Sequence, residues 1–257
     1  MGSFVRHPQY ETSAQGTVAQ KIFIQDQTTD IIDLYFHQEL NTSTLSAPSV
    51  VDARTFDLTA GHGAVVGNFL EISEDVHVSQ FEILNVVTNT ITVDCPIDHA
   101  FTTSAAVRVS NINMAVDGSV TPVVFQIDPI PTQEWDIVRV ILVINDGTAM
   151  DFTTFGGIPA LTNGCCIRYK NSVRENIFNW KSNGDFINRS FDYAILQNTG
   201  QNQRSFVSRC TFAGTSKRGV AARLEGSKGD ELQVIIQDDL TDLTSVRIIA
   251  QGHEVQS

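Results

Sequence analysis

The chain has 257 residues, of which 42% are hydrophobic and 18% are charged, and its formal net charge is −12. This length accommodates one large β domain or two smaller ones with a real hydrophobic core. Its scattered basic residues argue against nucleic acid as the main partner, because binding along phosphates draws on clustered Lys and Arg.

The N-terminal region is expected to form an arm followed by strands. The first dozen residues predict a flexible arm that becomes ordered only on a partner. Residues 18–24 and 30–38 are candidate strands, and we assign residues 1–43 to this region. No apolar segment has the length of a signal peptide, and none approaches the ~20 residues of a membrane-spanning helix. We therefore expect synthesis in a cytoplasm and no membrane partner.

Residues 44–115 predict a small β-barrel. Glycine and asparagine turns separate five short strand candidates, and closing such a sheet removes its exposed edges. The glycine-rich stretch around His62 lacks the GK[ST] ending of a phosphate-binding loop, so we interpret it as a tight turn. The five candidates are residues 55–58, 69–72, 81–87, 91–94 and 107–109.

Residues 116–257 predict an antiparallel β-sandwich of the jelly-roll type. Residues 220–225, 231–237 and 246–251 alternate between apolar and polar side chains, as half-buried strands do. Residues 226–230 are expected to join the first two of these strands as a hairpin. Residues 135–145 predict a central strand that ends at a turn beginning with Asn145 and Asp146. The expected fold is all-β, with the small barrel inserted before the sandwich or packed beside it.

Residue types that could carry chemistry do not form a recognisable motif. The four cysteines lack CxxC spacing and are interpreted as buried free thiols, with adjacent Cys165 and Cys166 on opposite faces of a strand. The six histidines lack metal-ligand spacing. Asp238 and Asp239 are expected to accept backbone N–H bonds in a turn rather than to hold calcium. We therefore expect no enzyme, cofactor, metal or small-molecule substrate.

Two stretches, covering about two-thirds of the chain, resemble proteins of tailed bacteriophages. Residues 49–109 resemble a small β-barrel insert of phage tail and baseplate proteins. They carry the segments AGHG (60–63), VGNFLEI (66–72) and VTNTITVD (87–94). Residues 135–255 resemble a group of tailed-phage virion proteins. They carry GTAMD (147–151), FGGI (155–158), LTNG (161–164), NWKSNGD (179–185), GVAARL (219–224), QDDLT (237–241) and AQGH (250–253).

The resemblance implies a homo-oligomeric component of the virion, located in the neck, collar or tail. Its partners would be copies of itself and other virion proteins. It supplies no catalytic residues. Two other interpretations stay open: a receptor- or carbohydrate-binding module at a fibre or baseplate, and a capsid decoration protein. A polysaccharide depolymerase is disfavoured, because such enzymes are usually longer and built from repeats.

Two long loops, residues 152–164 and 187–203, are candidates for contacts between subunits, because long ordered loops in compact domains are usually functional. Large aromatic residues dominate interface energetics, so we single out those in and beside these loops. The alternative is that they fill the sandwich core, and we favour it slightly for Trp180. The candidate interface residues are Phe155, Trp180, Phe186 and Tyr193, with Phe178 beside them.

Overall fold

The computed structural model describes residues 5–6, 31–75, 77–129, 131–148, 150–151, 153–170, 174–190, 192–197, 204–211 and 222–255. The predicted strand at residues 18–24 and nearly all of the predicted arm lie outside these residues. The described part is mostly antiparallel β-structure, as predicted. It also contains one short α-helix, α2 (Asn183–Arg189), and one 3-10 turn, η1 (Gly226–Lys228).

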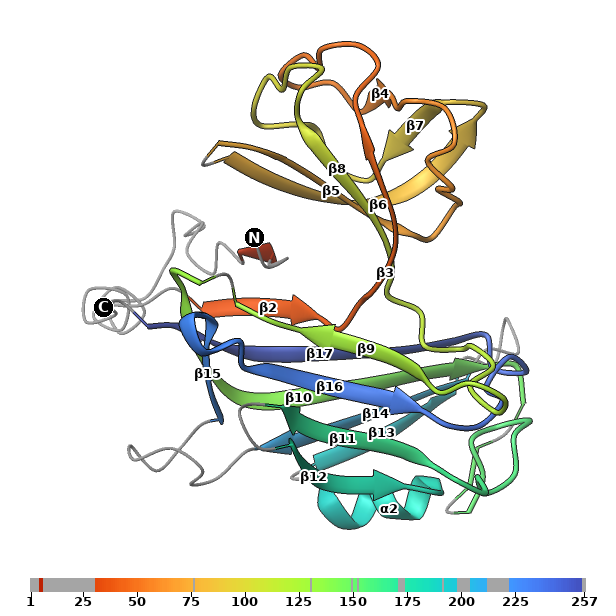
Figure 1. Cartoon of the computed structure of the whole chain (residues 1–257). Helices are drawn as coiled ribbons and strands as arrows, with labels where there is room; N and C mark the ends of the chain where they lie inside the picture. Colours follow the sequence, from red (N-terminus) through yellow and green to blue (C-terminus); the bar gives the residue numbers. More distant parts are fainter. Residues whose placement is uncertain are drawn as a thin grey trace, which may run out of the picture.

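The larger part of the molecule is a sandwich of two antiparallel sheets (Figure 1). The first sheet has the order β1-β2-β17-β10-β14-β13, and β15 also pairs with β10. Its strands are β1 (Val5–Arg6), β2 (Ile31–Tyr35), β10 (Glu134–Asp146), β13 (Asp192–Gln197), β14 (Arg204–Thr211), β15 (Ala222–Glu225) and β17 (Ser245–Glu254). The second sheet has the order β12-β11-β16-β9. Its strands are β9 (Val123–Ile127), β11 (Cys165–Lys170), β12 (Arg174–Trp180) and β16 (Glu231–Ile236).

The connections of the sandwich follow a jelly-roll pattern. In the first sheet β2, β17, β10 and β14 are successive neighbours, and in the second β9, β16, β11 and β12 are. The chain passes from β2 to β9 and from β10 to β11, and later from β16 to β17, and so changes sheet each time. Four strands of each sheet, connected in this way, form the double-sheet architecture of a jelly roll.

The smaller part is a single six-stranded sheet inserted between β2 and β9. Its order is β3-β8-β5-β6-β7-β4, and all five predicted strands are present. The strands are β3 (Gln38–Thr44), β4 (Thr55–Asp57), β5 (Phe69–Glu74), β6 (His77–Val87), β7 (Thr90–Val93) and β8 (Ala106–Asn111). The prediction of a closed barrel is wrong. The sheet is open: β3 and three-residue β4 form no ladder with each other, and the segments that follow them meet at an isolated bridge between Leu45 and Leu58 and at side-chain hydrogen bonds between Thr44 and Thr59.

The inserted sheet changes the expected division of the chain at residue 43. β2 belongs to the sandwich, whereas β3 belongs to the small sheet. β3 and β8 are antiparallel neighbours with Gln38 opposite Asn111, so the chain enters and leaves the small domain side by side. Each domain has its own hydrophobic cluster, from Leu45 to Val109 in the small domain and from Leu34 to Ala250 in the sandwich.

The expected hairpin around residues 226–230 is wrong in its pairing. β15 pairs with β10 in the first sheet, whereas β16 pairs with β11 and β9 in the second. Residues 226–230 therefore carry the chain between the layers of the sandwich. Asp230 stabilises this crossing, because its carboxylate accepts hydrogen bonds from the Glu225 amide (3.0 Å) and the Tyr169 hydroxyl (3.0 Å).

Candidate interaction surfaces

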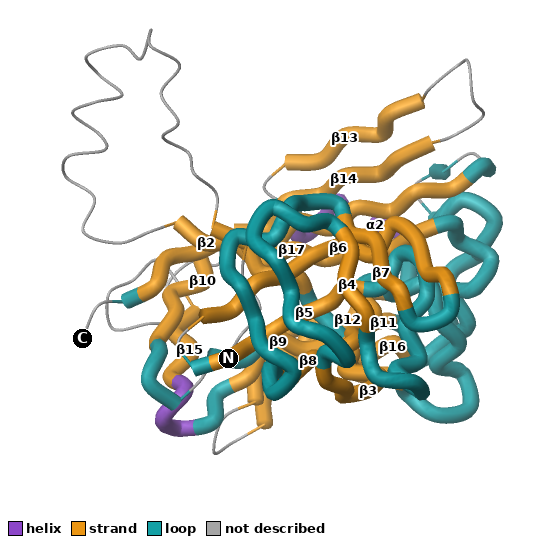
Figure 2. Tube along the Cα trace, turned by 90° about the horizontal axis from the view of Figure 1, so that it is seen from above, coloured by secondary structure: helices purple, strands orange, loops and turns teal. Residues whose placement is uncertain are grey.

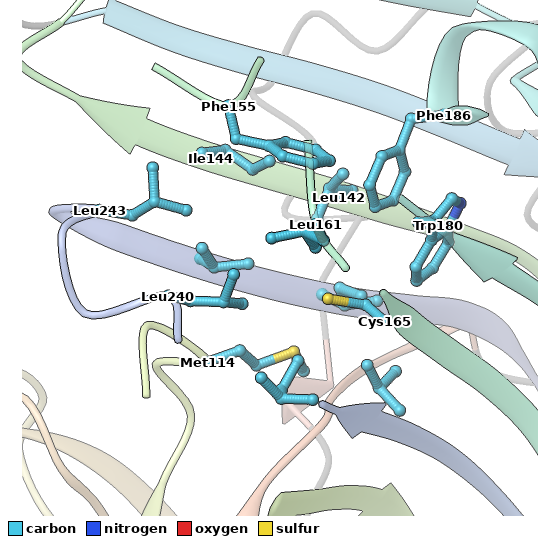
Figure 3. A pocket seen from close by; sticks show the side chains of 14 residues that line it. Met114, Leu142, Ile144, Phe155, Leu161, Cys165, Trp180, Phe186, Leu240 and Leu243 are labelled. Atoms are coloured by element: carbon cyan, nitrogen blue, oxygen red, sulfur yellow. The ribbon is translucent and has the colours of Figure 1, made fainter. Parts of the chain in front are cut away.

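Three of the four predicted interface residues lie in the sandwich core (Figure 3). Phe155, Trp180 and Phe186 are almost fully buried. The Trp180 and Phe186 rings stack with their centroids 4.0 Å apart, and Phe155 meets Phe186 edge-on at 5.7 Å. These positions do not support the prediction that the three residues anchor an interface, and they agree with the alternative of core packing. The neighbouring Phe178 is partly buried against the same cluster.

The fourth predicted residue, Tyr193, is exposed. It lies on β13, inside a stretch that we had expected to be a loop. Its ladder partner is buried Ser208, and the partner of Ile195 is buried Phe206. Paired residues share a face of a sheet, so Tyr193 and Ile195 lie on the inner face of the first sheet. The second sheet does not cover them fully. Their exposed fractions are 53% and 38%, which leaves two large apolar side chains open.

β13 is also the outer strand of its sheet (Figure 2). Within the described residues β14 is its pairing neighbour, and no other described strand pairs with its outer edge. An edge of this kind is a template on which a strand from another chain can pair. On the opposite face of β13, Asp192 forms an exposed ion pair with Arg209 at 3.4 Å.

A second exposed apolar area lies on the small domain. The glycine loop of residues 61–67 runs along the end of β6, because the Gly67 amide donates to the Ile83 carbonyl at 2.8 Å. Four large aliphatic side chains on these two segments are between 52% and 62% exposed. We call them the valine–leucine patch: Val65, Val66, Leu84 and Val87.

The glycine loop is a structural turn, as predicted. Gly61, Gly63 and Gly67 all have positive φ angles. Buried His62 fastens this loop to the next turn: its Nδ1 accepts from the Ala64 amide at 3.0 Å, and its Nε2 lies 3.2 Å from the Thr88 carbonyl oxygen. An accepting Nδ1 requires the neutral tautomer with the proton on Nε2, which then donates to Thr88. His62 thus has a structural role, because it joins the two turns by hydrogen bonds.

Both aspartates of the acidic turn accept backbone N–H bonds, as predicted. One carboxylate oxygen of buried Asp238 accepts from the backbone amides of Asn163 (2.9 Å) and Gly164 (2.5 Å), and this holds the start of β11 against the end of β16. Asp239 accepts from the Thr241 amide at 2.9 Å. Among the described residues, no group of three His, Cys, Asp or Glu side chains is arranged to hold a metal ion.

The cysteines are free thiols. Cys165, Cys166 and Cys210 are buried, as predicted, but the prediction of burial is wrong for Cys95, which is exposed. Burial raises the pKa of Cys165 to about 12, and it also raises the pKa of the other three thiols. A raised pKa leaves little thiolate at neutral pH, and the thiolate is the nucleophilic form.

A polar hollow of about 430 Å³ lies on the outer face of the second sheet. Cys165 and Ile167 of β11 face the core, so the alternate residues Cys166 and Arg168 face outward. Their ladder partners on β12 are Asn179 and Asn176. Sequence reasoning missed this site, although the alternation of β11 could have indicated its outward positions. The residues that line it are Thr162, Asn163, Cys166, Arg168, Asn176, Phe178, Asn179, Lys181 and Gln237.

No family model, curated protein or solved structure gives a significant match to the chain. Within the described residues, none of the helical structure has the length and apolar character needed to cross a membrane.

Proposed function

We propose that this chain is a structural subunit of a tailed-phage virion, located in its neck, collar or tail, and that it works by assembling with copies of itself and with neighbouring virion proteins. The observation that carries the proposal is edge strand β13, whose outer edge pairs with no other described strand and which carries exposed Tyr193 and Ile195. Sheet edges of this kind are normally shortened, charged or covered in proteins that act alone. The placement in a virion is supported by the sequence resemblance of residues 49–109 and 135–255.

The positions of the two apolar areas favour head-to-tail contact. β2 and β13 lie at opposite sides of the first sheet, and the small domain follows β2 directly. The small domain, which carries the valine–leucine patch, and β13 therefore lie in different parts of the molecule (Figure 1). A contact between two different surfaces of one subunit generates a ring when the rotation closes. We propose that β13 of one copy packs against the valine–leucine patch of the next.

A mixing experiment tests this arrangement. Tyr193→Asp and Leu84→Asp each place a charge in one of the two surfaces, and each variant alone is expected to remain monomeric. A mixture of the two still contains one intact pair of surfaces, so it should form a one-to-one dimer. Native mass spectrometry and sedimentation velocity distinguish these species. Val120→Asp is the matched control, because Val120 is 90% exposed and lies outside both surfaces, and this variant should assemble as the unmodified chain does.

Two outcomes would contradict the proposal. An unmodified chain that stays monomeric at every concentration would overturn self-assembly. A mixture that fails to dimerise while both variants remain folded would overturn head-to-tail contact, because a symmetric contact cannot be rescued in this way.

The position in the virion requires a separate measurement. Particle mass spectrometry should detect the chain, and a particle map should give its copy number. A ring predicts a small multiple of the local symmetry, whereas a capsid decoration protein would be present in hundreds of copies. Absence from purified particles would overturn the proposed location.

A further inference from the structure

The polar hollow differs in charge from the rest of the protein. Two of its nine lining residues, Arg168 and Lys181, are cationic and none is acidic, although the whole chain has a net charge of −12. Neither cation forms an ion pair with another described residue. A concave site lined by one sign of charge raises the local concentration of the opposite charge. The hollow therefore favours an anionic group.

Hydrogen bonds hold the walls of the hollow in place. Arg168 Nε donates to Asn176 Oδ1 at 3.2 Å, which fixes the guanidinium, and its two terminal nitrogens form no hydrogen bond to another described residue. Asn179 Nδ2 donates to the Asn163 carbonyl at 2.8 Å, and Asn163 Nδ2 donates to the Gln237 carbonyl at 3.2 Å. These bonds join three segments of the chain into one surface. Polar groups fixed before binding reduce the ordering cost that a ligand would otherwise meet.

The remaining polar groups that line the hollow can form hydrogen bonds with the hydroxyl groups of a ligand. The hollow contains side-chain amides from Asn163, Asn176, Asn179 and Gln237, and the hydroxyl of Thr162. An amide both donates and accepts hydrogen bonds, as a sugar hydroxyl does. A guanidinium binds a carboxylate through two parallel hydrogen bonds. The volume of about 430 Å³ lies within the range of about 300–1,000 Å³ that is typical of small-molecule sites.

We propose that this hollow binds an acidic saccharide, with Arg168 and Lys181 on its carboxylate groups and the amides on its hydroxyl groups. The proposal goes beyond assembly through β13, because the hollow lies on the other sheet of the sandwich. It would add recognition of an acidic glycan to a structural subunit. Success or failure of this binding leaves the self-assembly result unchanged, so the two proposals are tested separately.

The experiment compares matched probes by calorimetry with the full chain. A galacturonate tetrasaccharide is expected to bind, and its methyl ester, which is uncharged but keeps the same hydroxyl groups, should bind at least tenfold more weakly. Arg168→Gln and Lys181→Gln should each weaken binding of the acidic probe about tenfold. Lys228→Gln is the charge-matched control, since Lys228 is exposed and lies outside the hollow, and it should bind as the unmodified chain does.

Side-chain amide resonances provide a second readout that does not depend on a variant. The acidic probe should shift the Asn163, Asn176 and Asn179 amide signals, which report directly from the hollow. Lys181→Gln changes a side chain without a hydrogen bond to another described residue, so it keeps the test valid if Arg168→Gln disturbs folding. No binding of the acidic probe at millimolar concentration, or equal binding of the methyl ester, would overturn the proposal. Tighter binding of a single-stranded oligonucleotide would overturn the saccharide class.

Discussion

Buried Glu71 and partly buried Gln80 form a cross-strand pair in the small domain. Gln80 Nε2 donates to Glu71 Oε2 at 2.8 Å, whereas Glu71 Oε1 and Gln80 Oε1 are buried without a hydrogen-bond partner. Burial raises the pKa of the Glu71 carboxyl above its ordinary value of 4.5. If Glu71 is protonated on Oε1, this hydroxyl group can donate a hydrogen bond to Gln80 Oε1, so that both oxygens gain a partner. The pair is therefore better suited to a neutral side chain than to a carboxylate.

This geometry predicts that Glu71→Gln stabilises the protein at pH 7. The pKa of Glu71 is higher in the folded protein than in the unfolded chain. Protonated Glu71 therefore contributes its full stability below the unfolded pKa, and this contribution is lost as the pH rises through the folded pKa. The amide that the substitution introduces would stay neutral at every pH. We expect the free energy of unfolding at pH 7 to increase by about 1 kcal/mol, because a buried group gains a partner. The gain should disappear below pH 4.5. Urea denaturation across this range measures both effects.

Glu39→Gln is the control for this prediction. Glu39 lies 3.8 Å from the same Arg108 that Glu71 faces across the sheet, but its side chain is half exposed. Exposed ion pairs contribute about 0–1 kcal/mol, so this change should leave the free energy of unfolding nearly constant. A decrease in stability of Glu71→Gln at pH 7 would show that the carboxylate is favourable in the folded state.

Single residues were predictable where their partners are close in the sequence. The turn roles of the 61–63 glycines and of Asp239 follow from local chemistry, and the structure confirms them. The hollow was not predictable, because Arg168 and Asn163 meet Asn176 and Gln237 only after two strands have paired with β11. The burial of Phe186 depends on packing between the two sheets, which local patterning leaves open.

Helix α2 closes one side of the sandwich. It contacts β12 and β14, one strand from each sheet. The Asp185 carboxylate accepts from the Lys181 and Ser182 amides at 2.8 and 3.0 Å, and this satisfies donors at the start of the helix. Phe186 is thereby fixed against Trp180. The helix and β13 thus have different tasks, although only two residues separate them.

Two alanine substitutions separate these tasks. Phe186→Ala removes a ring from the core and should lower the free energy of unfolding by about 3–5 kcal/mol, with a cavity left behind. Tyr193→Ala removes an exposed ring and should change the stability of the monomer by less than about 1 kcal/mol, yet it should weaken self-association. Urea denaturation and sedimentation velocity measure the two effects. Equal losses of monomer stability would contradict the assignment of Tyr193 to a contact surface.

Elements were easier to predict than their partners. Alternation located the strands of residues 231–237 and 246–251 as β16 and β17, but it did not indicate which sheet each strand joins. The expected hairpin failed for this reason, since the chain around Asp230 changes layer. The sequence predicts a loop where β13 lies, because an edge strand with exposed residues on both faces has no clear alternation.

Insertion of one domain into another determines the plan of the whole molecule. The two hydrophobic clusters share no residue. Contacts between the domains include the Tyr35 and Phe69 rings, with centroids 5.5 Å apart, and the ion pair of Arg247 with Glu82 at 3.3 Å. The Arg247 and Glu82 side chains are about one-third exposed, so this pair contributes little to stability. Each domain should therefore hold its own fold without the other.

We predict that residues 38–111 fold as an independent domain. Gln38 and Asn111 are ladder partners, so excision leaves the two new termini side by side and breaks no strand of the sheet. The same geometry allows a two- or three-residue glycine–serine link to join residues 37 and 112 of the sandwich, because facing residues of antiparallel strands lie about 4.5–5.5 Å apart. Dispersed amide resonances and a cooperative thermal transition are expected for both products. A collapsed amide spectrum for the excised domain would show that the sandwich is required for its fold.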